Sequence, residues 1–201
     1  MYQPVDECTV EPVTLDELKD QLNIVLTDTS RDTKLTDLIS SARASAENKT
    51  KRYLRIGSEE EKAATYKLPL DTFPLTGNRI IKIFKCPVTE IVDITYYDLN
   101  NDLKTLDESY YDFDTINEPA RIKESPGHSW PSTSEKFNAV IIQFKCGYQL
   151  AANVPHDIKR GILMIAAHLF ENPADVVTGT QVNEIPESSA FLLNDYIVNT
   201  L

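Results

Sequence analysis

Glycine is scarce in this sequence of 201 residues, and its spacing excludes two common nucleotide sites. The six glycines are Gly57, Gly77, Gly127, Gly147, Gly161 and Gly179. A P-loop and a dinucleotide-binding turn both need several glycines within a few residues of one another, and these are too scattered. We therefore expect no nucleotide and no other cofactor.

Histidine is scarce, and no side chain of a type that commonly carries out catalysis lies in a recognised motif. The three histidines, His128, His156 and His168, form no HExxH or similar ligand pair. No serine or cysteine lies in a nucleophile motif such as GxSxG. The sequence therefore predicts no catalytic, cofactor-binding or metal-binding residues, and a protein that is not an enzyme.

Cysteine is also rare, and its spacing excludes a disulfide framework and a zinc site. Cys8, Cys86 and Cys146 are odd in number, widely separated and without a CxxC pair. Cys86 and Cys146 each lie in an apolar stretch, so we expect both to be buried thiols that act as small hydrophobic residues. The sequence leaves the state of Cys8 undecided.

Long apolar runs and an excess of basic charge are both missing. No stretch approaches the roughly 20 apolar residues that cross a bilayer, and Met1 to Pro12 lack the layout of a secretory signal. We therefore expect a chain that folds in the cytoplasm without membrane contact. Its 31 acidic and 20 basic residues give a formal net charge of -11, which repels phosphate backbones. This charge argues against a protein that grips DNA, but it suits one that lets DNA slide past.

An acidic segment in the middle of the chain resembles a calcium loop only in part. Asp98, Asn100 and Asp102 match the first ligand positions, but Leu103 replaces the required glycine and Ser109 the final glutamate. Apolar and β-branched residues flank the segment on both sides. We therefore interpret residues 98–102 as the polar turn of a β-hairpin.

The sequence predicts helices at both ends of the chain. Thr14 and Glu17 form a capping box, and Pro155 suits the first turn of a helix. The apolar spacing predicts helices over residues 14–26, 32–54 and 155–172, and a short final helix within 187–201. In the second helix, Arg43 and Glu47 are expected away from the apolar face.

The middle of the chain has the two-residue period of β-strands. Strands are expected over residues 64–70, 79–84, 89–97, 110–113, 120–123 and 139–144. The chain is therefore predicted to be one domain of the α+β class, with a β region over residues 64–148.

Two features are candidates for contacts between subunits. The second helix is rich in alanine and serine, and Leu38, Ala42 and Ala46 on it would let another helix approach closely. The same residues fit ordinary core packing within one chain. Trp130, beside Pro131, fits either a groove at the base of a loop or an anchor at an interface.

The order of several short motifs is distinctive. The chain contains, in order, Val13-Thr-Leu-Asp-Glu-Leu-Lys19, Pro87-Val-Thr-Glu-Ile91, Phe144-Lys-Cys-Gly-Tyr148, Val154-Pro155 with Ile158-Lys159, and His168-Leu-Phe-Glu-Asn172. This succession resembles the head-tail connector, or adaptor, proteins of long-tailed bacteriophages, which form a ring below the portal. The resemblance covers residues 13–173, leaving a lead over residues 1–12 and a looser match over 174–201.

The resemblance implies a fold and a set of partners. It implies a helical bundle with an inserted antiparallel β region, in a subunit that forms a ring of twelve copies at the neck of a virion. One face of the ring would meet the portal protein and the other a stopper or tail-terminator protein, with genomic DNA passing through the channel without sequence-specific binding. Residues 174–201 would be a linker and a docking tail, whose portal-binding residues are expected to be Phe191, Leu192, Tyr196, Ile197 and Leu201.

Three other functions remain open at this point. The chain could be a stopper, head-completion or tail-completion protein of the same neck. It could be a small cytoplasmic enzyme, for which a pocket with converging polar groups and shifted pKa values would argue. It could also be a regulatory DNA-binding domain, which tight specific binding to DNA would show.

Overall fold

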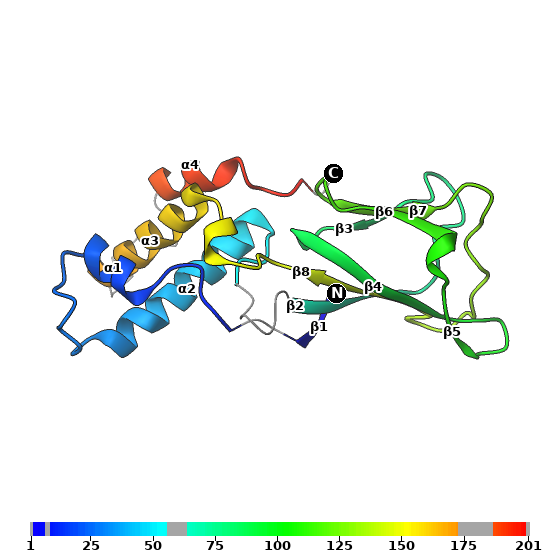
Figure 1. Cartoon of the computed structure of the whole chain (residues 1–201), viewed down its shortest axis with the longest axis horizontal. Helices are drawn as coiled ribbons and strands as arrows, with labels where there is room; N and C mark the ends of the chain where they lie inside the picture. Colours follow the sequence, from blue (N-terminus) through cyan, green and yellow to red (C-terminus); the bar gives the residue numbers. More distant parts are fainter. Residues whose placement is uncertain (1, 7–8, 56–63, 173–186, 200–201) are drawn as a thin grey trace, which may run out of the picture.

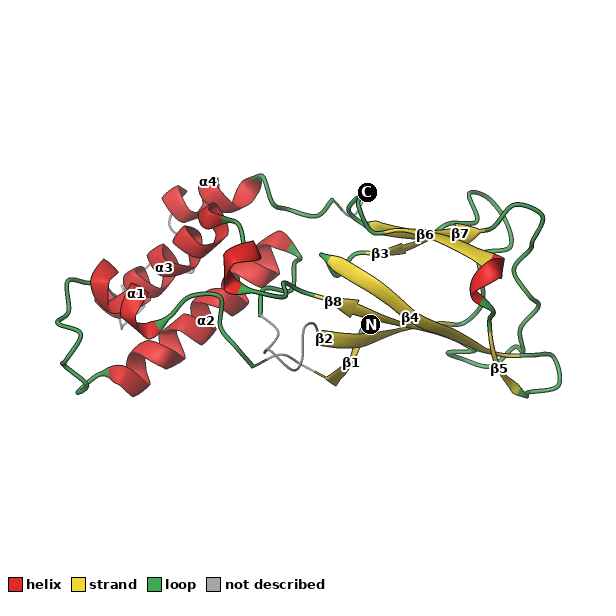
Figure 2. Cartoon of the chain, in the orientation of Figure 1, coloured by secondary structure: helices red, strands yellow, loops and turns green. Residues whose placement is uncertain are grey.

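A computed structural model of the chain describes residues 2–6, 9–55, 64–172 and 187–199. The molecule is elongated, with the helices at one end and the β-sheets at the other (Figure 1). The chain begins with a strand in the β region, forms two helices, returns to the β region for the remaining strands, and forms its last two helices at the helical end (Figure 2). The predicted α+β class and the antiparallel sheets are confirmed.

Helix α1 spans Leu15–Gln21 and begins with the predicted capping box. The Glu17 amide donates to Thr14 Oγ1 over 3.1 Å, and the Thr14 amide donates to Glu17 Oε2 over 2.7 Å. The prediction that this helix continues to residue 26 is wrong. Asn23 has a φ of 55° and the Ile24 amide donates back to the Lys19 carbonyl, which ends the helix early.

Helix α2 spans Asp32–Thr50 and is also shorter than predicted. Lys51 adopts a left-handed φ of 60°, which ends the helix. Tyr53, which lies within the predicted helix bounds of 32–54, instead lies beyond the helix and packs among the strands. Helix α3 spans His156–Glu171, close to the predicted bounds, and α4 spans Glu187–Asn194.

Two antiparallel sheets make up the β region. The five-stranded sheet has the order β1-β2-β8-β4-β5, formed by Gln3–Asp6, Ala64–Leu70, Val140–Cys146, Val88–Tyr97 and Leu103–Thr105. The three-stranded sheet has the order β3-β7-β6, formed by Ile81–Ile83, Ala120–Glu124 and Tyr111–Asp114. The six predicted strands are all present, whereas β1 and β5 were not predicted.

The predicted hairpin turn joins β4 to β5. Thr95 faces Thr105 and Tyr97 faces Leu103 in the antiparallel register. Between the strands, Asp98 Oδ1 accepts hydrogen bonds from the amides of Asn100 and Asp102. The carboxylate of Asp98 therefore serves the turn itself, as the hairpin interpretation requires.

The chain has two hydrophobic cores rather than one. The β core lies between the two sheets, where Phe73 stacks on Trp130 with ring centroids 4.8 Å apart. Cys86 and Cys146 are fully buried, as predicted. The helical core is formed by Val13, Leu18, Leu35, Ile39, Ala42, Ala46, Leu54, Val154, Ile158, Ile162, Ile165, Ala166 and Leu193. Among the described residues, no helix is both long and apolar enough to span a membrane.

Candidate assembly surfaces

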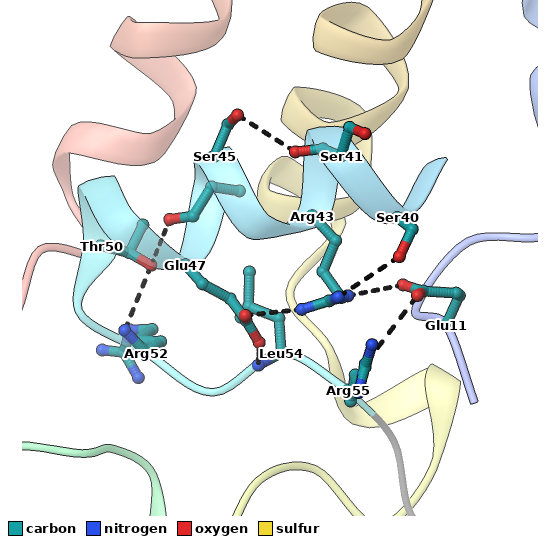
Figure 3. Close-up of polar contacts among 11 residues, drawn as sticks. Glu11, Ser40, Ser41, Arg43, Ser45, Glu47, Thr50, Arg52, Leu54 and Arg55 are labelled. Carbon is teal, nitrogen blue, oxygen red and sulfur yellow. Dashed lines mark hydrogen bonds and ion pairs between the residues drawn. The ribbon is translucent and has the colours of Figure 1, made fainter. Parts of the chain in front are cut away.

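A buried arginine organises the polar contacts of α2. Arg43 is 6% exposed, and its Nε donates to Glu11 Oε2 over 2.8 Å and its Nη1 to Glu47 Oε2 over 2.6 Å (Figure 3). The other oxygen of Glu47 accepts the Leu54 amide over 2.8 Å. The sequence placed Arg43 on the outer side of the helix, and the structure corrects this. Its cation instead joins α2 to the segment before α1, and Glu47 joins α2 to the segment after it.

The loop between α1 and α2 is held by a second buried cation. Lys19 is 2% exposed, and its Nζ lies 2.5 Å from Asp32 Oδ1 and 3.3 Å from the Leu26 carbonyl oxygen. Because both partners lie beyond α1, this lysine fixes the loop against the start of α2. Neither Arg43 nor Lys19 is a free binding group.

The predicted subunit-interface residues lie mostly inside the protomer. Ala42 and Ala46 are fully buried in the helical core, because α3 packs closely on this side of α2. Trp130 stacks on Phe73, and its indole Nε1 donates to the Arg79 carbonyl over 3.1 Å. These three residues are core residues, which corrects the interface prediction for their side chains. Only Leu38 remains partly accessible.

The C-terminal segment packs on the helices instead of extending from them. Leu193 of α4 is fully buried and lies against Gly161 of α3, where an added Cβ atom would come within 3.1 Å of it. Val198 is 3% exposed, and its amide donates to the Thr50 carbonyl at the end of α2 over 2.9 Å. Residues 187–199 therefore belong to the helical end of the molecule.

Arg52 joins this segment to the β region, and we call the contacts that it makes the Arg52 junction. Its Nε donates to the Tyr196 carbonyl over 2.7 Å, and its Nη1 donates to Glu118 Oε1 over 2.7 Å. Its Nη2 pairs with the other Glu118 oxygen. Burial lowers the pKa of Arg52, but the hydrogen bond with Glu118, together with the electrostatic interactions with Tyr148 and Glu118, outweighs that effect and leaves the pKa raised. Glu118 lies in the turn between β6 and β7.

The predicted portal-binding residues divide into two groups. Phe191 is 77% exposed and Ile197 is 38% exposed. Leu192 and Tyr196 are half-buried, and Tyr196 packs against the helical core. Leu201 lies outside the described residues. Two of the five predicted side chains are therefore displayed to solvent.

A second exposed apolar region lies at the far end of the β region, and the sequence did not reveal it. Leu99 and Leu103 protrude from the β4–β5 hairpin, and Phe137, 86% exposed, protrudes from the loop before β8. The two loops lie side by side, because the Tyr97 amide donates to the Ala139 carbonyl. No periodic pattern marks these residues, since Leu99 and Phe137 lie in turns and Leu103 begins a strand of only three residues.

The described residues show no arrangement suited to catalysis. They contain no group of three or more His, Cys, Asp or Glu side chains that could hold a metal ion. A hollow of about 460 Å³ lies on the outer face of the three-stranded sheet, beside Asp114 and Arg121. The hydrogen bonds from Arg121 and Asn117 lower the pKa of Asp114 well below its usual range, so this carboxyl stays ionised. Its partners hold a turn, which is a structural role.

Comparison with known proteins identifies similar sequences and folds. Residues 12–78, about a third of the chain, match the family model described as phage gp6-like head-tail connector protein. Among curated protein sequences, no relative matches. The sequence resemblance to head-tail connector proteins is confirmed over the matched residues.

The whole fold is similar to chains in solved structures of gene transfer agent (GTA) particles. A chain in the virion of the native particle matches with a TM-score of 0.76 and 18% identity, and covers 100% of this chain and 97% of its own. A chain in the neck of the empty particle, computed with C6 symmetry, matches with a TM-score of 0.74, the same identity and the same coverage. A chain in the neck of the native particle, computed with C12 symmetry, matches at 0.67 with 17% identity, over 99% of this chain and 97% of its own.

These comparisons define the class of protein. The fold matches a neck protein over essentially its full length, and the first third of the chain matches head-tail connector sequences. The family matched by residues 12–78 is one of structural proteins, and the likeness to the chains of the solved particles is a likeness of fold.

Proposed function

We propose that this chain is a subunit of the ring that joins the portal vertex of a phage head to the tail. Twelve copies surround a channel through which the genomic DNA passes. The agreement between two independent comparisons carries this proposal: a head-tail connector family match over residues 12–78, and a full-length likeness to chains of GTA necks, one of them computed with C12 symmetry. The virion neck is its proposed location, after assembly in the host cytoplasm.

A closed ring needs two different surfaces on each subunit, because every copy contacts one neighbour on each side. The elongated protomer has separate helical and β ends (Figure 2), which offers surfaces far apart from one another. Leu38 on α2 is a candidate at the helical end. The exposed side chains of Leu99, Leu103 and Phe137 are candidates at the β end.

Portal binding is assigned to the C-terminal segment. Phe191 and Ile197 are the exposed apolar residues of that segment, and large exposed side chains of this kind are typical anchors at interfaces. Leu192 and Tyr196 are half-buried and remain part of the proposed surface. Leu201 remains part of the proposal, as do the lead over residues 1–12, the connector domain over 13–173 and the docking tail over 174–201.

The acidic character of the chain suits a channel protein. A net charge of -11 disfavours tight binding to phosphate backbones, so a duplex is not held in place as it passes. The stopper or tail-terminator protein is the proposed partner on the opposite face of the ring. If the chain were itself a stopper or tail-completion protein, it would bind that layer and not the portal.

Electron microscopy of the purified chain with the portal protein of the same phage tests the proposal. End-on views should show a ring with a central opening, stacked on the portal in side views. Portal particles that look the same with and without the chain would overturn it.

A further inference from the structure

Arg52 makes contacts that bring together three distant parts of the sequence. It lies just after α2, 66 residues before Glu118 and 144 residues before Tyr196. Its three donor nitrogens are divided between the two partners, with Nε on the Tyr196 carbonyl and the other two on the Glu118 carboxylate. The guanidinium geometry permits this division because its donors point in different directions within one plane.

The position of Arg52 explains why these contacts matter. The helical core and the β core are separate, and Arg52 lies where the chain passes from one to the other. Its side chain is 11% exposed, so its charge is largely removed from water. A guanidinium that has lost most of its contact with water depends on such protein partners, so breaking these hydrogen bonds is costly.

An exposed apolar residue lies close in the sequence to each partner of Arg52. Ile197 follows Tyr196 directly and is 38% exposed. Ile116 lies two residues before Glu118 in the β6–β7 turn and is 93% exposed. In Figure 1 the C-terminal segment runs from α4 toward the nearby end of β6 and β7. The Arg52 junction thus fixes two backbone segments, each of which displays an exposed apolar residue.

We infer that Arg52 is a positioning residue, which holds the C-terminal segment and the β6–β7 turn in one fixed arrangement before assembly. The segment then reaches its partner with Ile197 already held in place, and not as a free peptide that orders on binding. Preformed surfaces bind more tightly because less conformational entropy is lost in the complex. The partner itself, the portal, rests on the proposed function, whereas the positioning role does not.

Hydrogen exchange measured by mass spectrometry on the purified full-length chain tests the positioning role. The amides of Tyr196, Ile197 and Val198 all donate to backbone carbonyls and report on the C-terminal segment. Arg52→Gln should speed exchange at these amides, and in the β6–β7 turn, by about tenfold to a hundredfold, as expected for the loss of hydrogen bonds to a charged group. Glu118→Gln should speed exchange in the turn more than in the C-terminal segment, because the bond from Nε to the Tyr196 carbonyl remains.

Arg121→Gln is the matched control. Arg121 pairs with Asp114 at the same hairpin but does not contact the C-terminal segment, so exchange at Tyr196 to Val198 should stay at the wild-type rate. If Arg52→Gln unfolds the whole chain, Arg52→Lys replaces it, since lysine keeps the charge but cannot divide its donors in the same way. Unchanged exchange of the C-terminal segment in the folded Arg52 variant would overturn the inference.

Binding to the purified portal separates this inference from the proposed function. If the wild-type chain binds the portal and the Arg52→Gln variant binds at least tenfold more weakly, the result supports both the proposed function and the positioning role of Arg52. Wild-type chain that does not bind would overturn the proposed partner, while the exchange result would still decide the positioning role. An Arg52→Gln variant with a released segment and unchanged affinity would overturn the preformed surface.

Discussion

The side chain of Leu193 lies so close to Gly161 that a Cβ atom at position 161 would come within 3.1 Å of Leu193 Cδ2. Helix α4 therefore packs so closely on α3 that any larger residue at position 161 would force the Leu193 side chain to shift. Because Leu193 is fully buried there, this contact fixes the C-terminal segment to the helical core.

Replacing Gly161 should detach α4. Gly161→Val places two methyl groups in the space of Leu193, and overpacking of this kind costs about 1 to 3 kcal/mol. Hydrogen exchange should rise over residues 187–194 while the strands stay protected. Arg160→Val introduces the same side chain at an exposed position of the same helix and should leave α4 protected. Equal exchange in the two variants would contradict the contact.

Removing Arg43 should destabilise the helical end strongly. Arg43→Met replaces the arginine with an unbranched apolar side chain. It leaves the carboxylates of Glu11 and Glu47 without their buried cation (Figure 3). We expect the free energy of unfolding, measured in urea, to fall by about 2 to 4 kcal/mol. The exposed Arg160→Met is the control and should change it by less than about 0.5 kcal/mol. A similarly small loss for Arg43→Met would show that the network contributes little.

Stability should fall at alkaline pH partly because of Cys86. Burial, and then the charge of Glu118, raises the pKa of this thiol from 9.0 to about 11. The unfolded chain releases the thiol proton at lower pH than the folded chain, so stability is complete below pH 9 and decreases as pH rises toward 11. This decrease amounts to about 2 to 3 kcal/mol. Cys86→Ala should flatten the pH dependence of the unfolding free energy in this window, and an unchanged slope would contradict the assignment.

Charges on the exposed face of the C-terminal segment should weaken portal binding without unfolding the protein. Phe191→Asp and Ile197→Asp alter accessible side chains, and each should reduce affinity by about tenfold or more if it replaces an interface anchor. Leu193→Asp is the contrast, because a charge at this buried position should unfold the helical end. Affinity can be followed by biolayer interferometry on immobilised portal, with circular dichroism as the check on folding. Wild-type affinity in both exposed variants would exclude this face.

Much of the fold followed from local patterns. The capping box at Thr14 and Glu17 and the proline before α3 both marked true helix starts. The polar turn after β4 was also predicted, since Asp98 forms its hydrogen bonds within a few residues. These features depend on neighbours in the sequence, so one sequence contains enough information to predict them.

Helix ends and short edge strands were harder to predict. Apolar residues continue past the end of α2, and only the left-handed backbone at Lys51 separates Tyr53 from the helix. Strands β1 and β5 are exposed along their whole length, so they lack the alternation of buried and exposed residues that marks a strand. They are held mainly by pairing with β2 and β4.

The candidate interfaces show the limit of sequence reasoning most clearly. Trp130 fits both a core and an interface by its residue type, and only its stacking on Phe73, distant in sequence, decides between them. Likewise, nothing near Arg52 in the sequence indicates Glu118 or Tyr196 as partners. Long-range contacts of this kind depend on the assembled fold.

The central claim is that copies of this chain close into a ring on the portal, and native mass spectrometry of the complex tests it most directly. The account predicts that portal particles gain about twelve times the 22.7 kDa mass of the subunit, with no stable species that carries only one or two copies. A chain that remains at 22.7 kDa in the presence of the portal would contradict the account.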